Sequence, residues 1–215
     1  IEEMIEALSC SEAAREGEGW IEGWGYDEML LAEGRAPTRR DLDRVSAARP
    51  VVVRRSDCHS CAVNSAALRL AGITRETPDP ADREPNGLLI ETAASALIER
   101  VRPPLDEARR MARMLRLREH YLSHGILTTT EMMPRRLPGS PDDALAVWRR
   151  AVAAGVPVDV NLYFAWTGGE DPFGVPELTP EEKTGPVRYA GVKLFGDGSV
   201  SGRTAAMREP FRFPA

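Results

Sequence analysis

The sequence predicts an α/β fold whose second half consists of about three parallel βα units. Three observations lead to this prediction. After residue 123, apolar segments typical of strands alternate with helix signals. These segments are rich in branched and aromatic residues, which favour strands that are covered on both faces. The chain has 215 residues, of which 42% are apolar, so it can bury a core of its own.

The first quarter of the chain is predicted to mix helices and strands. Residues 1–16 carry apolar side chains at helical spacing, which predicts one helix. Aromatic and apolar residues interleaved with glycine predict a strand over 20–27. The stretch from Thr38 to Asp41 has the form of a capping box, so a short helix should begin there and end near Val45.

The next elements follow the same mixed pattern. A β-branched run predicts a strand over 50–55, followed by a loop. Residues 64–71 are predicted as a helix that Gly72 closes. Residues 88–101 should begin extended and become helical near Thr92. Two prolines just after this segment should end the helix.

The second half begins with a long helix signal over 106–122, followed by a strand over 125–132. A serine, a proline and two aspartates predict that another helix begins at Ser140, and it should end at Gly155. The long helix is predicted to pack through an apolar stripe made mainly of Ala108, Met111, Leu115 and Leu122, with Met114 and Tyr121.

Two further strands complete the alternation. Residues 156–164 place an apolar side chain at every second position, which predicts a strand with one buried face. A short helix should begin at Thr179, and a strand over 187–195 ends in a glycine-rich loop.

The composition excludes several classes of function. The formal net charge is −5 with acids and bases interspersed, so no basic face for nucleic acid is expected. The sequence has no apolar run of about 18 residues, so no membrane contact through a spanning helix is expected. Three cysteines do not make a disulfide framework, and a cytoplasmic location is the default expectation.

Polar residues stand near the predicted carboxyl ends of the parallel strands, where sites of α/β proteins form. They are Glu131, then Asn161 or Tyr163, then Lys193 and Asp197, and they could share one pocket. Lys193 is the strongest candidate, because its apolar neighbours give it little route to water. A buried lysine must lose its charge, find a partner or be modified, although a side chain that reaches water at a sheet edge remains possible.

The loop after the strand at 50–55 contains a second candidate site. Cys58-x-x-Cys61 between a strand and a helix is the setting of a thioredoxin-like redox site. As a zinc site the motif lacks a second pair of ligands. Asp57 and His59 could line a pocket there, or Asp57 could simply bond a structural histidine, and both interpretations stay open.

Several segments, in order and nearly end to end, resemble the YtcJ-like branch of the amidohydrolase superfamily, also called amidohydrolase family 3. They are Trp20-Ile21-x-Gly23-x-Gly25-Tyr26-Asp27, Thr38-Arg39-x-Asp41-Leu42-Asp43, Asp57-x-His59-x-x-x-x-Asn64-Ser65, Asn86-Gly87-Leu88-Leu89, Ser123-x-Gly125-Ile126-x-Thr128, Gly191-Val192-Lys193-Leu194-Phe195-x-Asp197-Gly198-Ser199 and Arg203-Thr204-Ala205. Tyr26 and Cys58 depart from the family pattern, which usually has Trp and Gly there.

The resemblance implies part of a (β/α)₈ TIM barrel. Residues 1–122 would be the segment after the first barrel strand together with an inserted mixed α/β region. Residues 123–215 would supply about three βα units of the barrel. Three units cannot close a barrel alone.

The resemblance also implies hydrolysis of amide-type C–N bonds in a small-molecule substrate. In such enzymes a divalent metal, expected here to be zinc, activates the hydroxide that attacks the bond. Lys193 resembles the lysine that many superfamily members carboxylate to a metal-binding carbamate. His59 and Asp57 would then belong to the catalytic pocket, and Asp197, Arg203 and Glu131 would contact the substrate.

The family's His-x-His motif is missing, and so are its later histidines and aspartate. We therefore expect an internal piece of such an enzyme that is inactive alone, binds no catalytic metal and leaves Lys193 unmodified. One alternative is a thioredoxin-like oxidoreductase that uses Cys58 and Cys61. Another is a non-catalytic assembly domain, in which open sheet edges would favour a homodimer.

Overall fold

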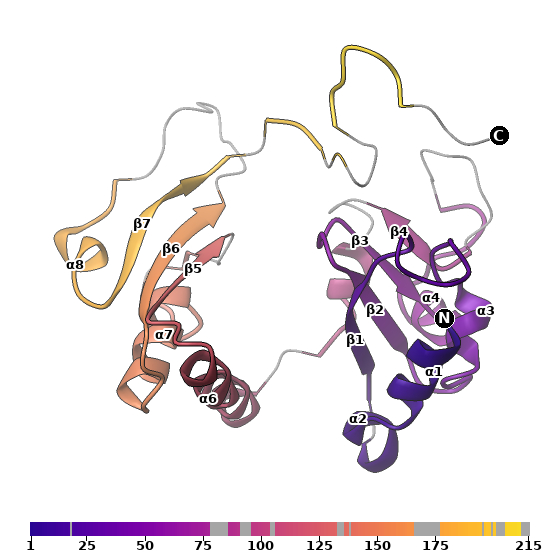
Figure 1. The fold of residues 1–215 in the computed structure, drawn as a ribbon, viewed down its shortest axis with the longest axis horizontal. Coiled ribbons are helices and arrows are strands. Elements are labelled where there is room, and N and C mark those ends of the chain that lie inside the picture. Colours follow the sequence, from indigo (N-terminus) through magenta and orange to yellow (C-terminus); the bar gives the residue numbers. More distant parts are fainter. Residues whose placement is uncertain are drawn as a thin grey trace. The chain divides into compact units, whose positions relative to one another are not determined.

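The structure is a computed structural model, and it describes residues 1–215 except 18, 78–85, 91–95, 104–105, 133–135, 138, 166–176, 195, 199, 201–204 and 212–215. The chain forms two compact units (Figure 1). Unit 1 comprises Ile1–Pro103 and Asp197–Ala215, and unit 2 comprises Pro104–Gly196. Both combine helices with a sheet, which confirms the α/β class.

Unit 1 is built on a four-stranded sheet in the order β1-β2-β3-β4. Strands β1 and β2 are parallel, and the pairs β2–β3 and β3–β4 are antiparallel. The strands are β1 (Ile21–Tyr26), β2 (Val51–Arg55), β3 (Ser60–Val63) and β4 (Leu88–Ile90). The helices are α1 (Glu2–Ser9), α2 (Glu12–Glu16), α3 (Arg39–Asp43) and α4 (Ser65–Leu70), and residues 96–99 are also helical.

Strand β2 buries consecutive valines, whose side chains point to opposite faces, so the sheet is covered by apolar side chains on both faces. Val51 and Val53 belong to a core cluster that includes Leu8 of α1 and Leu42 of α3. Val52 belongs to the other cluster, with Leu68 of α4, Cys61, Leu89 and Ile98. Successive residues of β2 therefore pack against helices on opposite faces of the sheet.

Three local predictions for unit 1 can be compared with the structure. The predicted capping box is confirmed, with Thr38 as the N-cap of α3 and Asp41 completing it. The predicted single helix over 1–16 is wrong, because it breaks after α1 and the Ser11 hydroxyl caps α2 by accepting a hydrogen bond from the Ala14 amide at 3.2 Å. The predicted loop before α4 is also wrong, because it contains β3.

Unit 2 contains three parallel strands in the order β5-β6-β7, each preceded by a helix (Figure 1). The strands are β5 (Thr128–Met132), β6 (Asp159–Ala165) and β7 (Val187–Lys193). The helices are α6 (Glu107–Ser123), α7 (Ala144–Ala153) and α8 (Pro180–Lys183). The parallel βα units are thus confirmed, whereas their membership of an eight-stranded barrel stays a prediction.

One face of this sheet packs on helices. Val160, Leu162 and Phe164 of β6 are buried on it, as the alternation predicted, and Trp148 of α7 is buried in the same cluster. We call this face the packed face and the opposite one the far face. The two faces matter below, because they separate candidate site residues.

Both long helices of unit 2 differ from their predictions in detail. Helix α6 contacts the core through Met111, Met114, Leu117 and Tyr121. The predicted stripe is wrong at Ala108, Leu115 and Leu122, which are exposed. Helix α7 begins at Ala144 rather than near Ser140, because the Asp143 carboxylate is its N-cap. That carboxylate also accepts a hydrogen bond from the Tyr189 hydroxyl at 3.1 Å, which fixes the helix start to β7.

Helix α6 lies wholly within unit 2. The predicted boundary between residues 122 and 123 separates two segments of the barrel that the family resemblance implies. This boundary stays a prediction. Within the described part of the chain, no helix is long and apolar enough to cross a membrane.

Candidate functional site

A β-bulge in β7 decides where the Lys193 side chain points. Leu162 of β6 pairs with Tyr189, but the next residue, Tyr163, pairs with Gly191, so Ala190 is an extra residue. In a regular strand, Lys193 would point to the same face as Tyr189, which is the packed face. The extra residue instead turns Val192 toward the core and Lys193 toward the far face.

Lys193 shares the far face with Tyr163. Lys193 pairs with Ala165 at the carboxyl ends of β7 and β6, and Tyr163 lies two residues before Ala165 on the same face. A Cβ atom added to Gly191 would lie 2.7 Å from Cε1 of Tyr163, so the glycine leaves room for the tyrosine ring. Lys193 is half-buried, which corrects the prediction that β7 is covered on both faces at this position.

Glu131 lies on the other face of the sheet. It pairs with Leu162, whose side chain is on the packed face. Its carboxylate accepts a hydrogen bond from the indole N–H of Trp148, and burial raises the pKa of this carboxyl. The predicted pocket shared by Glu131 and Lys193 is therefore divided by the sheet, since neighbouring side chains of a strand point to opposite sides.

Asp57 and His59 belong to the hairpin that joins β2 to β3 in unit 1. The Asp57 carboxylate accepts a hydrogen bond from the His59 backbone N–H at 3.0 Å, and Cys58 between them has a φ of 64°. The same carboxylate pairs with the Arg55 guanidinium at 2.7 Å. Asp57 thus shapes the turn that carries the half-buried His59.

Arg55, which no sequence pattern singled out, organises this region. Its side chain is only 5% exposed, and it pairs with Glu28 at 2.8 Å and with Asp27 at 3.4 Å in addition to Asp57. Hydrogen bonding to Glu28 raises the pKa of Arg55 above its ordinary value, despite burial. Arg55 ends a strand that begins with three valines, and Asp57 follows two residues later, which was the available signal.

The two cysteines of the Cys-x-x-Cys motif do not have the setting of a redox site. Cys61 lies in β3, 1% exposed, and burial raises the pKa of its thiol to about 11. A redox thiol needs a lowered pKa, usually at the start of a helix. Helix α4 begins only at Ser65, and the Asn64 side chain caps it, so the predicted thioredoxin-like context is wrong.

The described residues do not form a complete metal site, since no group of three or more His, Cys, Asp or Glu side chains among them could hold a metal ion. His59 lies in unit 1, and the stacked pair His120 and His124 lies at the end of α6 in unit 2. Asp197 is exposed and accepts a hydrogen bond from the Ala206 amide at 3.0 Å. Arg203 lies outside the described residues.

Comparison with known proteins gives a consistent result. Residues 1–215 match a family described as the amidohydrolase family. The chain is 31% identical over 231 residues to YtcJ of Bacillus subtilis, a protein named as an amidohydrolase, and covers 40% of it. It is 37% identical over 86 residues to the N-substituted formamide deformylase of Arthrobacter pascens, which is 36% of this chain and 16% of that enzyme.

Two solved structures are similar in fold. Both are uncharacterized metal-dependent hydrolases, one from Pyrococcus horikoshii and one from Pyrococcus furiosus. The TM-scores are 0.57 and 0.54, and the sequence identities are 24% and 26%. The alignments cover 97% of this chain, and 40% and 41% of those chains. The chain thus spans about two fifths of the length of YtcJ and of these structures.

Proposed function

Because the chain belongs to the amidohydrolase family, we propose that it is part of a metal-dependent hydrolase that cleaves amide-type C–N bonds of a small molecule. The observation that carries this proposal is the family match over all 215 residues. The similarity to a protein named as a formamide deformylase supports an amide-type bond as the target. The similarity to a structure of a metal-dependent hydrolase at 26% identity supports the use of a metal.

Lys193 is the residue of this chain that we assign to the metal, as a carbamate. Its position at the carboxyl end of a parallel strand supports the assignment, because sites form at that edge. A divalent metal, with zinc as the proposed ion, polarises a carbonyl and activates water. The described residues lack the other ligands of such a site.

The remaining candidates take different roles in this proposal. His59 is the pocket residue of the hairpin, and Asp57 and Arg55 position it through the turn. Glu131 supports β5 against Trp148, since its carboxylate is engaged on the packed face. Asp197 and Arg203 are proposed to contact the substrate.

The test compares the two lysines of the chain, Lys193 and Lys183. In the longer protein that contains this chain, Lys193→Ala should lower hydrolysis of N-formyl and N-acyl amides by at least about 100-fold and reduce bound metal. Lys183→Ala should change neither, because Lys183 is exposed on α8.

Two outcomes would count against the proposal separately. Full metal content in Lys193→Ala would show that Lys193 is not a ligand. A metal-loaded parent protein without activity on any amide would show that the bond class is wrong.

A further inference from the structure

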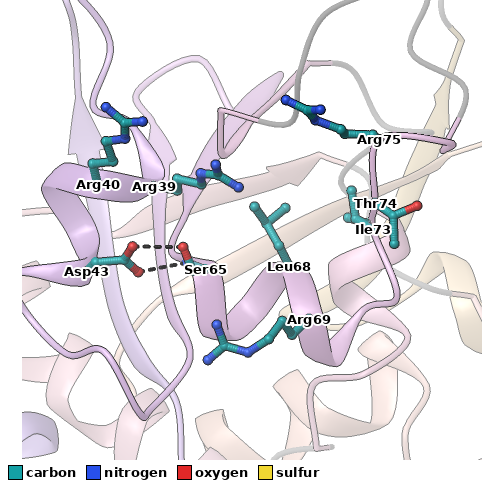
Figure 2. A pocket seen from close by; sticks show the side chains of 9 residues that line it. All are labelled: Arg39, Arg40, Asp43, Ser65, Leu68, Arg69, Ile73, Thr74 and Arg75. Carbon is teal, nitrogen blue, oxygen red and sulfur yellow. Dashed lines mark hydrogen bonds between the residues drawn. The ribbon is translucent and has the colours of Figure 1, made fainter.

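Unit 1 contains a pocket of about 360 Å³ in which positive charge is concentrated (Figure 2). Residues of α3, of α4 and of the segment 73–75 line it. Four of these residues are arginines, namely Arg39, Arg40, Arg69 and Arg75, and one, Asp43, is an acid. The chain as a whole has a formal net charge of −5, so the positive charge of this pocket is opposite in sign to the net charge of the chain.

Two acids near the pocket, Asp43 and Asp41, already hold partners. The Asp43 carboxylate accepts hydrogen bonds from the Ser65 amide at 2.9 Å and from the Ser65 hydroxyl at 2.7 Å (Figure 2). Asp41 forms a bidentate pair with Arg35 at 2.7 and 3.0 Å, and this pair holds the pKa of Asp41 well below its usual range. Among the described residues, neither Arg39 nor Arg40 forms an ion pair.

The position of Arg39 is fixed before any ligand arrives. Its backbone N–H donates to the Asn86 carbonyl at 2.7 Å. The backbone passes so close to Gly87 that a Cβ atom there would lie 2.7 Å from the Arg39 nitrogen. The capping box of α3 holds the preceding turn. A guanidinium on a fixed backbone loses less freedom when it binds a ligand.

The floor of the pocket is apolar. Leu68 of α4 points into it between Arg39 and Ile73 (Figure 2). Leu68 is 3% exposed and belongs to the core, so the floor is rigid. Guanidinium groups around an apolar floor suit a ligand with an anionic end and an apolar body.

We propose that this pocket binds a small molecule that carries a phosphate group. Guanidinium groups match a phosphate with pairs of parallel charge-assisted hydrogen bonds, and several of them can share its charge. The volume falls within the range of small-molecule sites. This proposal is independent of the hydrolase function, because it rests only on residues of unit 1.

The test is calorimetric titration of the 215-residue chain with pyrophosphate at constant ionic strength. The double variant Arg39→Gln/Arg75→Gln should bind at least about tenfold more weakly, because it loses two charge-assisted contacts. The matched control is Arg109→Gln/Arg113→Gln on α6, which changes the net charge equally and should stay within about twofold of the unchanged chain. Circular dichroism checks the fold, and Arg75→Gln alone serves if the double variant is unfolded.

Three results would overturn the proposal. The first is that pyrophosphate does not bind at millimolar concentration. The second is that the control weakens binding as much as the pocket variant, which would show general charge attraction. The third is tighter binding of citrate than of pyrophosphate, which would show that the pocket prefers carboxylates.

Discussion

Arg55 shows what one buried charge does for a local structure. Three carboxylates from two loops surround its guanidinium, so the loop after β1 and the hairpin after β2 are tied to the same point. Removing the arginine would leave acids with a partly desolvated, uncompensated charge, which is costlier than losing an exposed ion pair. The position of His59 depends on this arrangement, since Asp57 bonds both Arg55 and the His59 backbone.

At the same scale, the three thiols should differ sharply in reactivity. Cys10 and Cys58 are exposed, whereas Cys61 is buried with a pKa raised to about 11. A disulfide reagent at pH 8 should therefore modify two thiols of the native chain quickly. The third should react at least about 100-fold more slowly and become fast in guanidinium chloride. Three fast thiols in the native chain would contradict the burial of Cys61, and a thiol that stays ionised below pH 7 would restore the redox interpretation.

The elements differ in how far the sequence determines them. Both predicted helix caps at Thr38 and Thr179 and the alternation of β6 follow from local chemistry, and the structure has them. Strand β3 was missed because its four small or β-branched residues carry no period, and pairing with β2 and β4 defines it. The face of α6 depends on how the helix meets the core, so Leu117 replaces Leu115 in contact.

The candidate site also combines features that the sequence predicts with features that only the structure shows. The sequence identifies Lys193 and its strand, but the bulge at Ala190 is invisible in it, because a regular alternation also accommodates these residues. Likewise, Glu131 stands at a strand end in the sequence, and only the pairing with Leu162 shows that it lies on the packed face. Side-chain direction at strand ends depends on register, which is a property of the sheet.

Inserting one alanine after Val192 should turn the lysine to the packed face, because the insertion shifts Lys193 by one position along the strand. The expected cost is about 2–4 kcal/mol of unfolding free energy, because an ammonium would be forced toward the core. Denaturant unfolding measures this cost, and reductive methylation of the native chain measures access to Lys193, with Lys183 as the internal standard. Ala190→Ser keeps the strand length and should change neither quantity. An insertion variant with unchanged stability and unchanged labelling would show that the register of β7 does not direct the lysine.

At the scale of the whole molecule, each unit has its own hydrophobic core. The chain covers about two fifths of the length of YtcJ, and the proposed activity is that of the longer protein. Strand β5 lies at one edge of its sheet and β7 at the other. Association of two chains through such edges stays a prediction that size-exclusion chromatography can test.

The isolated 215-residue chain should not retain stoichiometric zinc. The reason is that its described residues contain no group of three donors that could hold a metal ion, and stable sites need such a set. Elemental analysis after desalting should find less than about 0.2 zinc ions per chain. The longer protein, purified in the same way, is the control and should retain metal. One zinc ion per isolated chain would show that it assembles a site by itself.

The extra residue in β7 also has a consequence for comparing related chains. Between Tyr189 and Lys193, a gap of one residue in an alignment corresponds to a regular strand in place of the bulge. A relative that lacks one residue in this interval would still present its lysine on the far face, whereas a relative of equal length that pairs without a bulge would turn the lysine to the helices. The lysine orientation therefore depends on the spacing and the bulge together, and matching the lysine alone does not make two chains equivalent.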